Sequence, residues 1–323
     1  MFRRSAIDAI EEQVLWNLPM IHGSWFFVDA STGSDTGRNG RTPNTALATL
    51  SAAYAKCTSG RGDGICIFSR SIASYSKSIE ETAVIDWAKY GITVIGISAG
   101  NGYFGRVRIY ADSDADLAYM INVSGQNNRF INLHINNEGD ANTCLRCVIV
   151  SGNRNYFENC HFIGGSHATP GAVAACSSLD LRASENRFVK CWFGTNSTVQ
   201  AQANAPVTFS TTQQGQNFFE DCYIITKSST AGHGGINIIG AATMNGWTIF
   251  KNCIFTAFSA TGGGSPALTK VVIGDAQNDC GILLHNCTEV GWSAWSTLAS
   301  KAYVGCAGET AAGAGGIASV PAA

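Results

Sequence analysis

The sequence feature that most limits the possible fold is an eight-residue stretch that returns at a fixed interval. The first clear copy is 155–162, and each of the next three copies begins 31 residues after the one before it. Every copy has a cysteine at the same place, and these cysteines are Cys160, Cys191, Cys222 and Cys253. Looser copies lie upstream, around Phe130, and downstream, around Cys287. A period of this length is typical of a solenoid, in which each repeat needs its neighbours to bury its apolar face.

The residues inside one repeat indicate which kind of solenoid this is. A short alternation of apolar residues precedes each copy, which is typical of a β-strand bounded by turn residues. The pairs are Ile121/Val123, Val148/Val150, Leu179/Leu181, Val207/Phe209, Ile236/Ile238 and Val271/Ile273. Within the copy, Phe157, Cys160 and Phe162 are spaced by three and then by two, so we interpret the polar pair before Cys160 as a bend between two strands. Three short strands in each repeat predict one rung of a parallel β-helix, because no run of helical period is long enough for a leucine-rich or ankyrin-type repeat.

The composition agrees with a fold made of turns and inward-facing apolar rows. The chain has 323 residues, 36 glycines and only 14% charged residues. Because solenoids grow without splitting, we expect one elongated body rather than two domains. The net charge of −2 gives no electrostatic basis for a nucleic acid or an anionic membrane as a partner. No apolar run approaches the length of a membrane-spanning helix.

Residues 1–24 differ from the body that follows them. Five apolar residues lie at roughly helical spacing, namely Ile7, Ile10, Val14, Leu15 and Leu18. Acidic residues interrupt the stretch where the apolar core of a cleavable signal peptide would lie. Two interpretations stay open: a helix that frays or docks on the body, or an anchoring arm that becomes ordered on a partner, where its apolar stripe is covered.

The segment that follows the arm has a distinctive order of strand, loop and glycine-led apolar runs. These features are an apolar strand from Trp25 to Asp29, a Gly33-Ser34-Asp35 loop, a Thr- and Leu-containing segment at 42–50, and glycine-led apolar runs at 62–67 and 91–96. In these features, residues 25–290 resemble the right-handed parallel β-helix proteins of the pectin-lyase-like superfamily. The resemblance implies an all-β fold: a single-stranded right-handed parallel β-helix with a short N-terminal capping helix and an N-terminal arm. It implies no single function, because this fold carries lyases, hydrolases and non-enzymatic virus proteins.

We therefore divide the chain into four parts. The anchoring arm spans 1–24, the first strand, loop and capping helix span 25–60, the β-helix spans 61–290, and a C-terminal cap with an Ala- and Gly-rich tail spans 291–323. A helical lid at 46–56 has a physical purpose, since the open end of a β-helix exposes unpaired strand edges. At the far end, Trp292 and Trp295 are candidates for the same purpose.

Twelve cysteines raise three chemical possibilities. A disulfide framework is disfavoured because residues stacked on successive rungs lie about 4.8 Å apart with parallel rather than converging Cβ vectors. A metal site is disfavoured because Cys144 and Cys147 form a lone CxxC without a second pair. We therefore predict a buried, unbridged row made of Cys160, Cys191, Cys222 and Cys253, with no metal and no cofactor. Unpaired thiols in a row also indicate assembly in a reducing cytoplasm.

One local pattern points to catalysis. Glu220 and Asp221 are followed by Gly232-His233-Gly234, which is similar to the acidic doublet and Gly-His-Gly of polygalacturonase-like glycosidases. The resemblance implies that Glu220, Asp221 and His233 would be catalytic, with the carboxylates protonating the glycosidic oxygen and activating water. The other motifs of that family are missing, and its Asn-Thr-Asp is matched only by an acid-free stretch at 196–198. Glu220 and Asp221 also hold the bend position of the repeat, so we favour a structural role for them.

A rod with an arm and no complete active site resembles, in its layout, the β-helix proteins of tailed bacteriophage virions. We therefore expect a protein that is not an enzyme: a homotrimeric capsid decoration (cement) protein that binds the major capsid protein or another virion protein. It would assemble in the cytoplasm of the host bacterium and lie on the capsid surface. The alternative is a phage tailspike that binds a surface glycan or depolymerises a polysaccharide as a glycosidase. Neither prediction includes a nucleic acid or a membrane as a partner.

Overall fold

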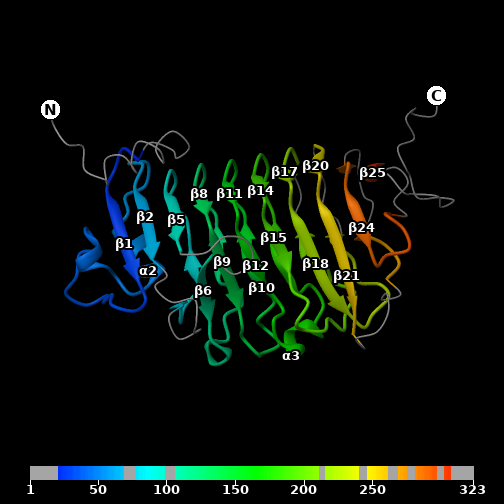
Figure 1. Cartoon of the computed structure of the whole chain (residues 1–323), viewed down its shortest axis with the longest axis horizontal. Coiled ribbons are helices and arrows are strands. Elements are labelled where there is room, and N and C mark those ends of the chain that lie inside the picture. Colours follow the sequence, from blue (N-terminus) through cyan, green and yellow to red (C-terminus); the bar gives the residue numbers. More distant parts are fainter. Residues whose placement is uncertain are drawn as a thin grey trace.

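The computed structural model of the protein describes residues 21–68, 78–98, 106–210, 215–239, 246–260, 268–274, 281–296 and 302–306. The five apolar residues of the predicted arm, Ile7 to Leu18, and the tail after Cys306 lie outside these residues. The described part is a parallel β-helix with three parallel sheets, as the repeat predicts. Its strands lie side by side along the long axis in chain order, from the blue N-terminal end to the orange C-terminal end (Figure 1).

We name the three sheets A, B and C. Sheet A has ten strands: β1 (Trp25–Asp29), β2 (Gly64–Phe68), β5 (Thr93–Ile97), β8 (Arg129–Ile131), β11 (Tyr156–Glu158), β14 (Arg187–Val189), β17 (Phe218–Glu220), β20 (Thr248–Lys251), β23 (Ile282–His285) and β25 (Ala302–Gly305). Sheet B has eight: β3 (Ile79–Glu80), β6 (Val107–Ala111), β9 (Leu133–Asn137), β12 (His161–Ile163), β15 (Trp192–Gly194), β18 (Tyr223–Ser228), β21 (Ile254–Ser259) and β24 (Thr288–Val290). Sheet C has seven: β4 (Ile85–Asp86), β7 (Ile121–Val123), β10 (Arg146–Val150), β13 (Ser177–Leu181), β16 (Val207–Phe209), β19 (Ile236–Ile238) and β22 (Val272–Gly274).

Helical segments are few and short. They are η1 (Pro43–Thr45), α2 (Leu50–Lys56), η4 (Ser113–Ala115) and α3 (Ala168–Gly171). Within the described part of the chain, no helix is long and apolar enough to cross a membrane.

The helix α2 lies where the sequence predicts a lid, and charged side chains from a later rung hold both of its ends. Glu81 Oε1 accepts hydrogen bonds from the amides of Leu50 (2.6 Å) and Ser51 (3.3 Å) at the N-terminus. At the C-terminus, Lys89 Nζ donates to three carbonyl oxygens, including that of Tyr54 at 2.7 Å. An acid at the N-terminus and a cation at the C-terminus complement the helix dipole. The lid is therefore tied to the rung beneath it by charge as well as by its buried leucine.

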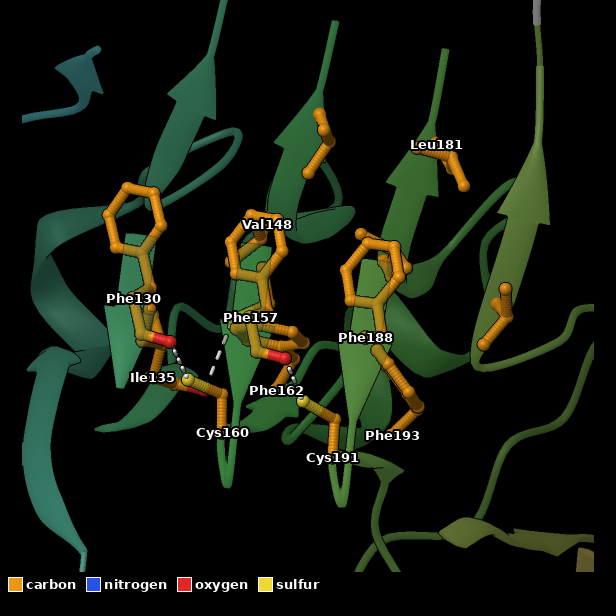
Figure 2. Packing of buried hydrophobic residues seen from close by; sticks show 14 of the residues in the cluster. Phe130, Ile135, Val148, Phe157, Cys160, Phe162, Leu181, Phe188, Cys191 and Phe193 are labelled. Carbon is orange, nitrogen blue, oxygen red and sulfur yellow. Dashed lines mark hydrogen bonds between the residues drawn. The ribbon is translucent and has the colours of Figure 1, made fainter. Parts of the chain in front are cut away.

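Stacked phenylalanines and cysteines fill the interior (Figure 2). The rings of Phe157 and Phe188 are parallel, with centroids 4.8 Å apart. The Cys160 thiol donates to the Phe130 carbonyl oxygen (3.3 Å), and the Cys191 thiol donates to that of Phe157 (3.4 Å). Such bonds to sheet carbonyl groups satisfy the thiols without a disulfide, and all four cysteines of the predicted row are buried and unbridged.

The bend between sheets A and B uses one left-handed residue in each of the six rungs from β8 to β23. These residues have φ between 49° and 58°, and they are Asn132, Asn159, Lys190, Asp221, Asn252 and Asn286. Asn and Asp tolerate this conformation better than other residues with a side chain. Their side chains also form a ladder in which Asn159 Nδ2 donates to Asn132 Oδ1 (3.0 Å) and Asn286 Nδ2 donates to Asn252 Oδ1 (2.8 Å). This ladder explains why the predicted bend is polar.

Lys190 breaks the ladder, and replacing it should stabilise the fold. In Lys190→Asn, the new amide would stand next to Asn159 Oδ1 and would suit the φ of 52°. We expect the free energy of unfolding to rise by about 0.5–1 kcal/mol, the value of one hydrogen bond plus a better left-handed residue. Chemical denaturation of Lys190→Asn and Lys190→Ala would measure this. An asparagine variant no more stable than the alanine variant would contradict the ladder.

Candidate functional site

The structure does not bring the three predicted catalytic residues together. Glu220 Oε2 accepts from Arg187 at 2.6 Å and its Oε1 from Lys251 at 3.2 Å, and these bonds lower the pKa of its carboxyl group. Asp221 is the left-handed residue of its bend, and its Oδ1 accepts from Asn252. Both residues are therefore occupied on the rim between sheets A and B.

His233 lies at the other end of strand β18. Its Nε2 is 2.7 Å from Thr226 Oγ1, and Thr226 is five residues after Asp221, which is about 16 Å of extended chain. The imidazole is 1% exposed, and burial lowers the pKa of His233 to about 4. A buried histidine at this distance shares no substrate with Glu220 or Asp221.

Cys144 and Cys147, where the sequence predicts no metal site, are both buried in the structure. Cys147 Sγ donates to the Ile135 carbonyl oxygen at 3.1 Å, and Cys144 Sγ lies 3.7 Å from Asp116 Oδ1. Among the residues that the structure describes, no three His, Cys, Asp or Glu side chains are placed to hold a metal ion together.

The strongest charged cluster is on the outer side of sheet C, at Asp180 in the middle of β13. Leu179 and Leu181 point inward, so the alternation of the strand turns Asp180 outward. Its carboxylate is nevertheless fully buried, because two guanidinium groups cover it. Oδ2 accepts from Arg146 Nε at 2.7 Å and from Arg182 Nη2 at 2.6 Å.

The second oxygen of this carboxylate is also occupied. Ser210 Oγ donates to Asp180 Oδ1 at 2.5 Å. With both oxygens engaged by donors, Asp180 is not arranged to act as a nucleophile or as a proton donor. Its effect is to fix two arginine side chains, and the cluster of one carboxylate and two guanidinium groups carries one net positive charge.

The guanidinium groups form the outer surface of the cluster. The side chains of Arg146 and Arg182 are 23% and 30% exposed. Within the described residues, the side chain of Arg146 donates only through Nε, so its two Nη groups remain available to a ligand. A guanidinium group held in this way presents paired N–H donors that match a carboxylate. The arrangement can therefore bind an anionic group at the surface of sheet C.

Polar side chains occur again in the same column two and three rungs away from Asp180. Asp86 pairs with Asn122 in the register of sheet C, and two rungs further the same column contains Asp180. Tyr119 donates to Asp86 at 3.0 Å, and Ser151 donates to Asn122 at 2.9 Å. Asp86 and Asp180 are about 14 Å apart at three rung spacings. That distance exceeds the 6.5–9.5 Å of an inverting glycosidase pair.

Sequence reasoning missed this cluster although one signal was present. The run Leu179-Asp180-Leu181-Arg182 places an acid and a base at outward positions of a strand with apolar residues inside. The partner Arg146 is 34 residues away, so it becomes visible only when the pairing of β10 with β13 is known.

Comparison with known proteins identifies the fold. No family model matches the chain, and no curated protein matches it. Among solved structures, the chain is similar to the pectin methylesterase from Aspergillus niger, with a TM-score of 0.57, 15% identity, and coverage of 95% of this chain and 92% of that one. It is also similar to pectate lyase Pel9A, with a TM-score of 0.51, 16% identity, and coverage of 88% and 73%.

These comparisons correct one prediction from the sequence. The expectation that the protein is not an enzyme is contradicted, since the similar solved structures are enzymes that act on pectin or pectate. The expectation rested on the incompleteness of the catalytic motif at Glu220, Asp221 and His233. Nothing in the comparisons links the chain to a bacteriophage. The chain has the right-handed parallel β-helix fold that the resemblance to the pectin-lyase-like superfamily predicts.

Proposed function

We propose that the protein is an enzyme that acts on an acidic polysaccharide, which it binds along the outer face of sheet C. The observation that carries this proposal is the guanidinium group of Arg146, fixed through Nε on the buried Asp180 and open at its Nη groups. Arg146 would bind the carboxylate of a uronate unit, and Arg182 would add a second positive charge beside it.

The geometry favours elimination over hydrolysis. In elimination, a base takes the proton from the carbon next to the uronate carboxylate, a C=C bond forms and the glycosidic C–O bond breaks; a fixed cation beside the carboxylate stabilises the negative charge that develops there. Hydrolysis by paired carboxylates finds less support, because Asp86 and Asp180 are too far apart and the oxygens of Asp180 are occupied. Names of similar structures support the substrate class, as both a pectin methylesterase and a pectate lyase share this fold.

The Arg146→Ala variant tests the proposal. Loss of one charged hydrogen-bonding partner costs about 1.5–3 kcal/mol, so we expect polygalacturonate to bind about 10- to 100-fold more weakly. Binding would be measured by calorimetry, and turnover by ultraviolet absorbance of unsaturated products, with reducing-end and methanol assays beside it. Arg146→Lys keeps the charge but loses the fork, and we expect it to recover only part of the affinity.

Arg187→Ala provides the matched control. Arg187 is also an ion-paired arginine, but it lies on sheet A with Glu220. We expect this variant to bind like the wild type. Equal binding of neutral galactan and polygalacturonate, or an Arg146→Ala variant that behaves like Arg187→Ala, would overturn the proposal.

We propose separately that the protein belongs to a bacteriophage tail. A homotrimeric phage tailspike that acts on a host surface glycan is the sequence-based alternative that agrees with a polysaccharide-acting enzyme. Support comes from the elongated β-helix and from the charged face on sheet C. Co-purification with phage particles at a low copy number, and a trimeric mass in sedimentation, are the expected observations.

A further inference from the structure

A small cavity with several hydroxyl groups in its wall lies where strands of sheet B pass into strands of sheet C. Its volume is about 10 Å³, and the residues around it include Ser177, Ser178, Thr226 and His233. A volume of this size corresponds to about one water molecule. The cavity is separate from the Arg146 surface, although Ser177 begins the same strand, β13, that carries Asp180.

Ser177 is the first of two reasons to assign a ligand to this cavity. Its side-chain oxygen is buried and has no hydrogen-bond partner among the residues that the structure describes. A buried hydroxyl group without a partner costs about 1–3 kcal/mol, and native structures usually satisfy such groups with protein or with ordered water.

The second reason is the direction of the hydrogen bonds at His233. Its Nδ1 faces the carbonyl oxygen of Gln202 at 3.0 Å, so Nδ1 must carry the proton. Nε2 then accepts a hydrogen bond, and the Thr226 hydroxyl group donates it at 2.7 Å. The lone pairs of Thr226 Oγ1 are therefore left to accept from another donor. A third hydroxyl group at the cavity, Ser178 Oγ, accepts from the amide of Gly164 and still has its own proton to donate.

We propose that this cavity is a binding site for one ordered water molecule, held by Ser177, Ser178 and Thr226. The water would accept from a serine hydroxyl group and donate to Thr226 Oγ1, which gives it the two to four polar partners that a buried water needs. His233 is then neither catalytic nor idle: it orients the Thr226 hydroxyl group so that the water has an acceptor.

Replacing Ser177 by alanine gives a test whose sign depends on the water. With the water in place, Ser177→Ala removes one hydrogen bond, and we expect the melting temperature to fall by about 2–4 °C. Without it, the variant removes an unsatisfied group and the melting temperature should stay the same or rise.

Thr248→Val is the matched control. Thr248 Oγ1 is likewise buried without a partner in the described chain, but Thr248 lies outside the cavity. We expect this variant to melt at the wild-type temperature or above it. A high-resolution crystal structure of the wild type should show one water within hydrogen-bond distance of Ser177 Oγ and Thr226 Oγ1. A Ser177→Ala variant that matches Thr248→Val, or a crystal structure with no water at that position, would overturn the assignment.

Discussion

Cys191→Asp is expected to leave the protein largely unfolded at room temperature. Cys191 is fully buried, and its thiol donates to the Phe157 carbonyl oxygen at 3.4 Å. An aspartate there would place a charge among stacked phenylalanines and thiol groups, or would have to stay protonated. Either state costs several kcal/mol, which is a large share of the 5–15 kcal/mol by which domains are usually stable.

Cys191→Ala separates the effect of charge from the effect of size. The alanine variant loses only the sulfur atom and leaves a small cavity, so we expect it to fold with a moderate loss of stability. Circular dichroism and urea denaturation of the two variants would measure the difference. If Cys191→Asp unfolds within about 1 kcal/mol of Cys191→Ala, then the cysteine row is open to water and the packing in Figure 2 is not that of the protein in solution.

The sequence predicts the fold well because the repeat length of a solenoid determines which residues pair on successive rungs. The spacing from Cys160 to Cys191 is the distance along the chain from one rung to the next, and the structure pairs Phe157 with Phe188 at that same offset. The polar bend is also visible in the sequence, since Asn or Asp recurs at the left-handed position in every one of the six rungs from β8 to β23 except that of Lys190. Local patterns suffice for these features because every rung repeats them.

The charged site is different because it is not repeated. Arg146 and Asp180 meet only through one pair of rungs, and the rung next to Asp180 has Ile149 at the same place in the column. The glycosidase-like motif is not an active site for the converse reason. Glu220 and His233 are close in sequence, but strand β18 separates them in space. In a β-helix, consecutive strands of the chain belong to different sheets, whereas adjacent strands of one sheet come from successive rungs. Residues of one site can therefore be far apart in sequence.

Lowering the pH should destabilise the protein through its buried histidines. Burial lowers the pKa of His161 to about 4 and of His233 to about 4, and burial together with nearby positive charge lowers that of His134 as well. Unfolded histidines bind protons below about pH 6.5, whereas folded His161 and His233 do not until about pH 4. The unfolded state then binds more protons, so stability is lost as the pH falls from about 6.5 to about 4.

The size of this effect follows from the pKa values of His161 and His233. For each of these two histidines, the fall of the pKa from about 6.5 to about 4 corresponds to about 3 kcal/mol of stability lost across the window. Buried Glu81 acts in the opposite direction, because burial raises its pKa and protonation favours the folded state. One carboxyl group does not offset three histidines, so we expect the free energy of unfolding to fall by several kcal/mol between pH 7 and pH 4.

His161→Gln should remove the contribution of His161 to the pH dependence of the free energy of unfolding. His161 Nε2 is 2.9 Å from the Gly194 carbonyl oxygen, to which it donates, and a glutamine amide can reproduce that bond without titrating. We expect urea denaturation across pH 4–7 to show a decrease in stability smaller by about 3 kcal/mol than in the wild type. His285→Gln is the control, because His285 is exposed at the end of β23 and its replacement should leave the curve unchanged. If His161→Gln follows the wild-type curve, this imidazole is already protonated in the folded protein and its burial is not what the packing of sheet B indicates.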